Sequence, residues 1–293
     1  MPERPDLTGP LLAWFDAHAR DLPWRAADRT GWGVLVSEVM LQQTPVARVL
    51  PVWQEWMRRW PRPSDLAAAG PGEAVRAWGR LGYPRRALRL VAAAEVIRDE
   101  HGDEVPADAE TLRALPGIGE YTAAAVAAFA FGRREVVVDT NVRRVEARAV
   151  SGPALPAPSY SAAERRLATE LLPADRERSV RWNAATMELG ALVCTARAPR
   201  CGECPLQDRC AWVAAGSPPH DGPPRRGQRW EGTDRQARGR IVQALRETDG
   251  TLTREQALAA SGAPEPQAER CLLGLLTDGL VEQDEAGGFT LPQ

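Results

Sequence analysis

The sequence predicts a mainly helical protein, with an all-α body followed by a small C-terminal unit of three helices and a hairpin. In residues 10–190 apolar side chains recur with a period near 3.6, and proline or glycine interrupts the pattern at short intervals. Only residues 135–138 resemble a strand, and they are too few to found a sheet. A Gly- and Pro-rich stretch at 216–234 predicts a linker before the C-terminal unit at 235–293.

The composition is that of a globular protein with one large or two modest cores. Of 293 residues, 44% are hydrophobic and 26% are charged. No apolar run approaches the roughly 20 residues of a membrane-spanning helix, and the N-terminal residues do not form a secretory signal. We therefore expect a cytoplasmic protein that does not bind membranes. The net charge of −2 means that a polyanion would have to bind a local basic patch.

Basic residues are unusual in kind, because the chain contains no lysine and all 37 are arginine. Chemistry through a lysine Schiff base or a lysine general base is therefore excluded. The three histidines, His18, His101 and His220, are too scattered to indicate a metallohydrolase.

Four of the five cysteines are clustered with the spacing C-x6-C-x2-C-x5-C, at Cys194, Cys201, Cys204 and Cys210. Without a secretory signal, such a cluster indicates a metal site more strongly than a set of disulfides. Four thiolates suit structural zinc or an iron-sulfur cluster, and the spacing does not choose between them. Cys271 lies in an apolar helical pattern and is expected in a core.

The pattern from residue 235 onward, three short helices and then a Gly-Gly turn, resembles a winged helix. Six arginines between Arg225 and Arg240 favour contact with DNA, although a plain structural appendage explains the segment about equally well. A unit this small is close to the lower size limit for independent folding, so we expect it to dock on the body or on DNA.

A turn in the body has the form expected of a phosphate-binding loop. Residues 115–123 read LeuProGlyIleGlyGluTyrThrAla and stand before a strongly helical segment. Gly117 and Gly119 permit a tight turn with exposed N–H groups at the start of that helix, where an anion binds readily. The motif is typical of a helix-hairpin-helix element.

Two carboxylates are candidates for acid–base chemistry. Glu38 interrupts an otherwise apolar helical pattern, so its pKa is expected to be raised and it suits a general acid. A structural hydrogen bond to buried backbone is the alternative. Asp139 stands before ThrAsnValArgArgVal and could be a simple helix N-cap, in a position that would also keep it ionised.

Taken together, the motifs resemble the MutY-type adenine DNA glycosylases of the helix-hairpin-helix superfamily, over about residues 8–215. The segments that carry the resemblance, in order, are 22–25 (LeuProTrpArg), 37–44 (SerGluValMetLeuGlnGlnThr), 81–83 (LeuGlyTyr), 115–123, 138–145 (ValAspThrAsnValArgArgVal), 187–194 (MetGluLeuGlyAlaLeuValCys) and the four cysteines.

The resemblance implies a monofunctional enzyme that flips adenine out of double-stranded DNA, where it is mispaired with 8-oxoguanine or guanine, and hydrolyses its glycosidic bond. Glu38 would then protonate the leaving adenine, and Asp139 would stabilise the oxocarbenium-like sugar. Tyr121 and Asn141 would complete the catalytic group. A single 4Fe-4S cluster would be held by the four clustered cysteines.

The same resemblance assigns the binding residues and the domains. Trp24 and Arg25 would line the adenine pocket, Gln42, Gln43 and Tyr83 would enter the base stack, and Gly117 and Gly119 would hold phosphate. It divides the chain into 1–30 and 139–215 for the iron-sulfur domain and 31–138 for a six-helix module. We expect a monomer associated with nucleoid DNA.

The sequence departs from the family at Thr140, usually glycine, at Pro84, usually tyrosine, and at Ala184, commonly Glu or Gln. The Nudix-like domain that reads 8-oxoguanine has no counterpart here, so the preference for 8-oxoguanine over guanine is left open.

Two other functions compete with adenine removal. A thymine or uracil mismatch glycosylase shares the scaffold, but Glu38 with GlnGlnThr favours adenine. A redox-sensing DNA-binding regulator would have no need of a buried Glu38. Lyase chemistry of the endonuclease III type requires a lysine, which the chain lacks.

Overall fold

The computed structural model describes residues 6–222 and 230–293. Contacts divide the chain into two compact units: 1–30, 107–112 and 119–224 form the first, and 31–106, 113–118 and 225–293 form the second. Arg225, Arg226 and Arg229, three of the six arginines expected to favour DNA contact, lie outside the described residues.

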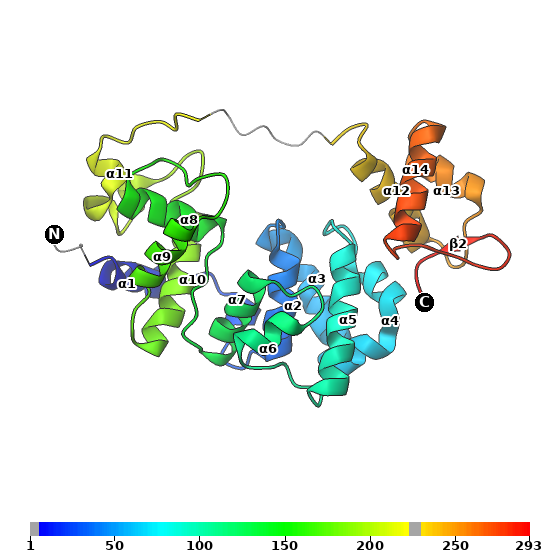
Figure 1. The fold of residues 1–293 in the computed structure, drawn as a ribbon, viewed down its shortest axis with the longest axis horizontal. Helices are drawn as coiled ribbons and strands as arrows, with labels where there is room; N and C mark the ends of the chain where they lie inside the picture. Colours follow the sequence, from blue (N-terminus) through cyan, green and yellow to red (C-terminus); the bar gives the residue numbers. More distant parts are fainter. Residues whose placement is uncertain (1–5, 223–229) are drawn as a thin grey trace. The chain divides into compact units, whose positions relative to one another are not determined.

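The first unit consists of helices and short helical turns (Figure 1). Its elements are α1 (Thr8–His18), η1 (Pro23–Arg25), α7 (Glu120–Phe131), α8 (Thr140–Glu146), η2 (Ala147–Ser151), α9 (Ala162–Leu171), α10 (Arg176–Leu192), η3 (Cys201–Glu203), η4 (Gln207–Arg209) and α11 (Ala211–Ala214). The element η2 is a π-helical turn. Helix α6 (Ala109–Ala114) spans the boundary between the units.

Helices α1 and α10 pack on each other and form the main core of the first unit. Leu11, Ala185 and Leu189 are completely buried there. Helix α8 packs against α10 so closely that a Cβ on Gly190 would lie 2.6 Å from the Cβ of Asn141. Glycine at position 190 therefore lets α8 and its N-terminal residues approach α10.

The second unit begins with α2 (Gly31–Leu41), α3 (Val46–Arg59), α4 (Pro63–Trp78) and α5 (Arg85–Glu100). Gly70, with φ +80°, interrupts α4 and bends it. Among the tryptophans of α3 and its C-cap, Trp56 and Trp60 are buried, whereas Trp53 is half-buried and donates to the carbonyl oxygen of Gly33.

The C-terminal segment of this unit has the expected three helices and hairpin: α12 (Asp234–Glu247), α13 (Arg254–Ser261), α14 (Glu265–Thr277), β1 (Glu282–Gln283) and β2 (Phe289–Thr290). The two strands are antiparallel, with Glu282 opposite Thr290. Cys271 is buried, as expected for a core residue.

The all-helical body is confirmed for the described residues. Residues 135–138 form no strand, and β1 and β2 of the C-terminal segment are the only strands in the part of the chain that the structure describes. None of the described helices is long and apolar enough to cross a bilayer.

Candidate functional site

Asp139 is the N-cap of α8, and its carboxylate is held in one orientation. Oδ1 accepts hydrogen bonds from the backbone N–H groups of Asn141 (2.8 Å) and Val142 (2.7 Å). Oδ2 accepts a hydrogen bond from the side-chain amide of Asn141 at 2.7 Å. Both oxygens are thus fixed by donors at the helix terminus, which is the geometry the sequence predicts for an N-cap.

Burial nevertheless raises the pKa of Asp139 above its usual range, and the hydrogen bonds from Val142 and Asn141 and the charge of Arg144 oppose this increase. Desolvation is therefore the largest influence on this pKa, and the helix terminus that was expected to keep the carboxyl ionised acts in the opposite direction. Positive charge that develops beside such a buried carboxyl favours its ionised form.

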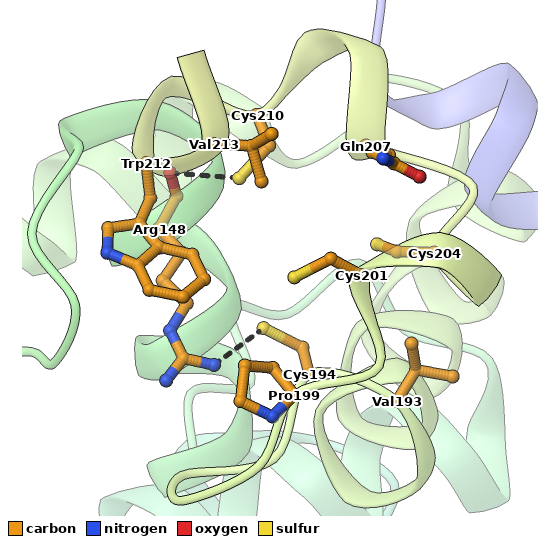
Figure 2. Close-up of a pocket in the computed structure, with 10 residues that line it drawn as sticks. All are labelled: Arg148, Val193, Cys194, Pro199, Cys201, Cys204, Gln207, Cys210, Trp212 and Val213. Atoms are coloured by element: carbon orange, nitrogen blue, oxygen red, sulfur yellow. Dashed lines mark hydrogen bonds between the residues drawn. The ribbon is translucent and has the colours of Figure 1, made fainter. Parts of the chain in front are cut away.

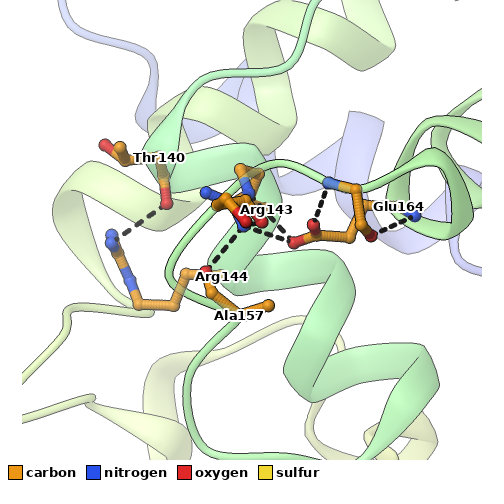
Figure 3. Close-up of polar contacts among 7 residues, drawn as sticks. Thr140, Arg143, Arg144, Ala157 and Glu164 are labelled. Atoms are coloured by element: carbon orange, nitrogen blue, oxygen red, sulfur yellow. Dashed lines mark hydrogen bonds and ion pairs between the residues drawn. The ribbon is translucent and has the colours of Figure 1, made fainter.

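Arg144, on the first turns of α8, connects this carboxylate with the cysteine region. Its guanidinium donates to the Asn141 side-chain oxygen (2.7 Å), to the carbonyl oxygen of Gly190 (2.7 Å) and to that of Cys194 (2.6 Å). It also donates to the carbonyl of Thr140, as Figure 3 shows. A continuous chain of hydrogen bonds therefore runs from Asp139 through Asn141 and Arg144 to Cys194.

The neighbouring Arg143 points in a different direction and holds α8 to α9. It pairs with Glu164 at 2.7 Å and donates to the carbonyl oxygen of Ala157 at the same distance (Figure 3). Since these contacts do not involve Asp139 or Cys194, Arg143 provides a matched control for Arg144.

Glu188 of α10 forms a buried ionic group with two arginines of the N-terminal segment. Arg20 donates to both carboxylate oxygens at 2.7 Å, and Arg25 donates to Oε2 at 3.0 Å. Burial alone would raise the pKa of Glu188, but the hydrogen bonds from Arg20 and the charge of Arg25 outweigh it and lower that pKa to about 2. Arg25, expected in the adenine pocket, is thus engaged with Glu188.

Two further residues assigned by the resemblance also lie in the first unit. Trp24 is buried in η1. Tyr121, in the first turn of α7, is half-buried and packs against a small cluster that includes Ala125 and Met187. Glu38 belongs to the second unit, where it is 6% exposed on α2 and is flanked along that helix by buried Ser37 and Val39.

The turn between α6 and α7 has the conformation that the glycine pattern predicts. Gly117 has φ +75°, and a Cβ at that position would lie 2.7 Å from the side chain of Arg89. Gly119 is the N-cap of α7 with φ −91°. Both glycines are exposed, so their backbone faces solvent at the start of a 12-residue helix.

Gln43 and Tyr83 share an uncommon backbone conformation, with φ of 56° and 51°. Arg86 of α5 joins the loops that carry them, because it donates to the carbonyl oxygens of Gln42 (2.7 Å) and Gly82 (3.0 Å). Burial lowers the pKa of Arg86 to about 10. These contacts bring together Gln42, Gln43 and Tyr83, the three residues that the resemblance expects to enter the base stack.

The four clustered cysteines surround a common hollow with about 280 Å³ of empty space, part of it open to solvent (Figure 2). Arg148, carried by η2, donates to Cys194 Sγ at 3.3 Å, and its guanidinium lies 4.7 Å from the ring centroid of Trp212. Cys201 and Cys204 enter the hollow from the opposite side in Figure 2.

The donor set fits an iron-sulfur cluster. Four thiols line one hollow, and cysteine thiolates are the ligands that hold such clusters. Burial raises the pKa of the Cys204 thiol to about 11, so binding of a cluster would displace a proton from it.

The departures from the family pattern have local explanations in two cases. Pro84 precedes α5 with φ −62°, which suits the start of a helix, and its carbonyl oxygen accepts from Ala87. Thr140 is exposed at the first position of α8. Ala184 is half-buried on α10, and its methyl group forms no hydrogen bond.

Comparisons with known proteins bear on the assignment. Residues 36–171 match the model of the HhH-GPD superfamily of base excision DNA repair proteins, and residues 194–210 match the iron-sulfur binding domain of endonuclease III. The adenine DNA glycosylase of Mycobacterium tuberculosis is 52% identical over 100% of this chain and 97% of its own length. The chain belongs to the adenine DNA glycosylases. That of Mycolicibacterium smegmatis is 53% identical over 96% of this chain and 94% of its own.

This DNA glycosylase also has the fold of its superfamily. A thermostable thymine-DNA glycosylase matches it with a TM-score of 0.64 and 28% identity, over 71% of this chain and 95% of that one. The helix-hairpin-helix fold, the iron-sulfur binding domain and the activity of a base excision repair glycosylase are therefore established for this chain.

The sequence analysis overlooked Arg20, Glu188 and Arg144. The segment ArgAspLeuProTrpArg, with an arginine at each end, and the second arginine of ValArgArgVal were visible signals. Apart from Thr140 and Asn141, however, their partners lie 46 to 168 residues away in the sequence, and only the fold brings them together.

Proposed function

We propose that this glycosylase removes adenine that is mispaired with 8-oxoguanine or guanine in double-stranded DNA, without cutting the strand. The observation that carries the proposal is the Asp139 carboxylate, fixed by three hydrogen bonds at the N-terminus of α8. We also propose that it acts as a monomer on nucleoid DNA in the cytoplasm.

Glu38 is the proposed general acid. The glycosidic bond of adenine breaks slowly when the base leaves as an anion, and protonation at N7 turns it into a neutral leaving group. The carboxyl is 6% exposed on a helix of mostly apolar residues, so it is largely removed from water, and we propose that it enters the reaction in its protonated form.

Asp139 is the proposed stabiliser of the sugar cation. As the bond to adenine breaks, positive charge develops on the sugar, and a nearby carboxylate lowers the energy of that state. Oδ2 of Asp139 accepts only the hydrogen bond from the Asn141 side chain and keeps a second lone-pair site, so the carboxylate can face the sugar while it remains fixed. Water then attacks the cation, since the chain has no lysine for a Schiff base.

The other assigned residues act in positioning. Asn141 orients Asp139 directly, Tyr121 and Trp24 shape the surroundings of the base, and the backbone at Gly117 and Gly119 binds a phosphate. Gln42, Gln43 and Tyr83 support the opened base stack. Removal of a mispaired base requires less unstacking energy than removal of a paired one, which favours mismatches.

A single 4Fe-4S cluster held by Cys194, Cys201, Cys204 and Cys210 is proposed to act structurally. When bound, it would fix the loop of residues 194–210, which has few buried side chains of its own. The Cys194 carbonyl oxygen accepts from Arg144, so order in this loop would also hold the Asn141–Asp139 pair in place.

Single-turnover assays test the proposal on duplexes that carry A, T or U opposite G or 8-oxoguanine. We expect free adenine and an abasic strand that remains intact until alkali or heat is applied. Release of thymine or uracil with adenine left in place would establish the mismatch alternative. Strand scission that keeps pace with base release, with the N-terminal amine blocked, would contradict a monofunctional reaction.

A further inference from the structure

The C-terminal segment is anchored on α4 and α5 of its own unit. Arg246 of α12 donates to the carbonyl oxygen of Val75 at 2.9 Å, and Arg76 donates to the carbonyl oxygen of Arg246. Asp278, which follows α14, pairs with Arg85 of α5 at 3.1 Å. These contacts fix the C-terminal end of α12 on α4 and the residue after α14 on the N-terminal end of α5.

The close approach extends to the end of the chain. A Cβ at Gly72 would lie 2.2 Å from the carbonyl oxygen of Pro292, so this glycine leaves room for the last residues on α4. Leu291 is 4% exposed. The C-terminal segment is therefore packed on the body and not merely tethered to it.

This anchoring places Arg235, in the first turn of α12, on Tyr83. The Arg235 guanidinium carbon lies 4.5 Å from the centroid of the Tyr83 ring and 5.5 Å from that of Trp230. Both rings are accessible, with Tyr83 41% and Trp230 50% exposed. A cation thus lies against two exposed aromatic side chains.

The surroundings of Arg235 carry a local excess of positive charge. Asp278 is shared by Arg85 and Arg238, so one carboxylate serves two guanidinium groups. Asp234, next to Arg235 in sequence, is paired with Arg270 at 2.9 Å. Aromatic faces with a surplus of arginine are suited to a nucleic acid strand, because bases stack on the rings and guanidinium groups pair with phosphates.

We propose that Arg235 and Trp230 form a DNA-binding surface with Tyr83, through which the C-terminal segment binds the duplex next to the mispaired base. The inference rests on the proposed function, in which Tyr83 enters the base stack. Arg235 stacks on Tyr83 and contacts an adjacent phosphate, and Trp230 provides a further stacking surface.

The strained conformation of Tyr83 agrees with this arrangement. Its φ of 51° is uncommon for a residue other than glycine and is held by Arg86, which donates to the preceding carbonyl of Gly82. A side chain presented in this way has a fixed position, so a cation stacked on it from the C-terminal segment acquires a fixed position as well.

Fluorescence anisotropy tests the proposal on full-length protein and a duplex with a non-hydrolysable 2′-fluoroadenosine opposite guanine. Arg235→Ala should weaken binding about tenfold, because it removes a phosphate contact and a stacked cation. The slope of log Kobs against log salt should decrease in magnitude by about 0.9, the contribution of one phosphate. Arg235→Lys should keep that slope and recover only part of the affinity.

Two further variants separate DNA contact from altered folding. Arg254→Ala changes another exposed arginine of the same segment, which pairs with Glu269, and should leave binding and its salt slope unchanged. In a Tyr83→Ala background, replacement of Arg235 should have a smaller effect than in the wild type, because the two side chains act together.

The possible outcomes are distinct. Arg235→Ala protein that binds as tightly as wild type with an unchanged salt slope would overturn the proposal. Tighter binding by the Arg235→Ala variant would overturn the proposal too, because Arg235 would then block the access of DNA to the Tyr83 ring. If wild type releases thymine or uracil and not adenine, the proposed function fails, and the same titrations on that mismatch still decide the role of Arg235.

Discussion

Replacement of Arg144 by glutamine should damage both stability and excision, because this side chain connects Asn141 with Cys194. Arg144 is 8% exposed, and glutamine is too short to reach the carbonyl oxygens of Gly190 and Cys194 and the Asn141 amide together. Each buried acceptor left unsatisfied costs ~1–3 kcal/mol. We therefore expect the free energy of unfolding to decrease by about 3–5 kcal/mol, with partial compensation from water.

Excision should decrease as well, since Asn141 loses the donor that orients it toward Asp139. Loss of a partner that orients a functional group typically costs about 10- to 100-fold in activity, and we expect a single-turnover rate reduced within that range. Urea denaturation, iron analysis and single-turnover excision of A opposite G on the same preparation measure the three quantities separately.

Arg143→Gln is the matched control. This arginine lies on the same helix as Arg144, but its replacement removes contacts to Glu164 of α9 and to the carbonyl of Ala157. It should therefore reduce stability but keep the excision rate within about threefold of wild type. The reasoning is refuted if Arg144→Gln protein, folded and with its full iron content, excises adenine within twofold of wild type.

Three further predictions concern other buried groups. Cys204→Ser should yield poorly folded protein without the brown absorbance of an iron-sulfur cluster; active, colourless wild-type protein with stoichiometric zinc would contradict the assignment. Glu146 is 4% exposed, and burial raises its pKa to about 8, so its contribution to the stability of the fold is lost as pH increases from about 4.5 to 8. Glu146→Gln should therefore raise Tm more at pH 8.5 than at pH 5. An equal change of Tm at both pH values would refute this explanation. Burial raises the pKa of Asp139, so the single-turnover excision rate should begin to decrease on acidification at a pH above ~3.9, the pKa of an ordinary aspartate. A rate that stays constant down to pH ~3.9 would argue against an ionised Asp139 in the reaction.

Much of the fold and part of the site follow from local sequence patterns. The 3.6-residue periodicity predicted the helical body, and the glycines of residues 115–123 predicted a tight turn, in which Gly117 has a φ of 75°. The N-cap geometry of Asp139 was also readable, because the capping donors lie two and three residues away.

Contacts between distant segments were not readable from the sequence. The ionic group of Glu188 with Arg20 and Arg25 joins residues more than 160 positions apart. The raised pKa of Asp139 depends on burial that an N-cap pattern does not reveal. The stacking of Arg235 on Tyr83 depends in the same way on how the C-terminal segment docks on α4 and α5.

The central claim is that Glu38 and Asp139 act on the same bond, one as acid and the other as stabiliser of the sugar cation. Single-turnover excision of A opposite G by Glu38→Gln, Asp139→Asn and the double variant tests it most directly, with duplex binding measured in parallel. Each single variant should lose at least about 100-fold while binding stays within threefold, and the double variant should lose less than the product of the two. Either single variant that retains excision within tenfold of wild type would contradict the account.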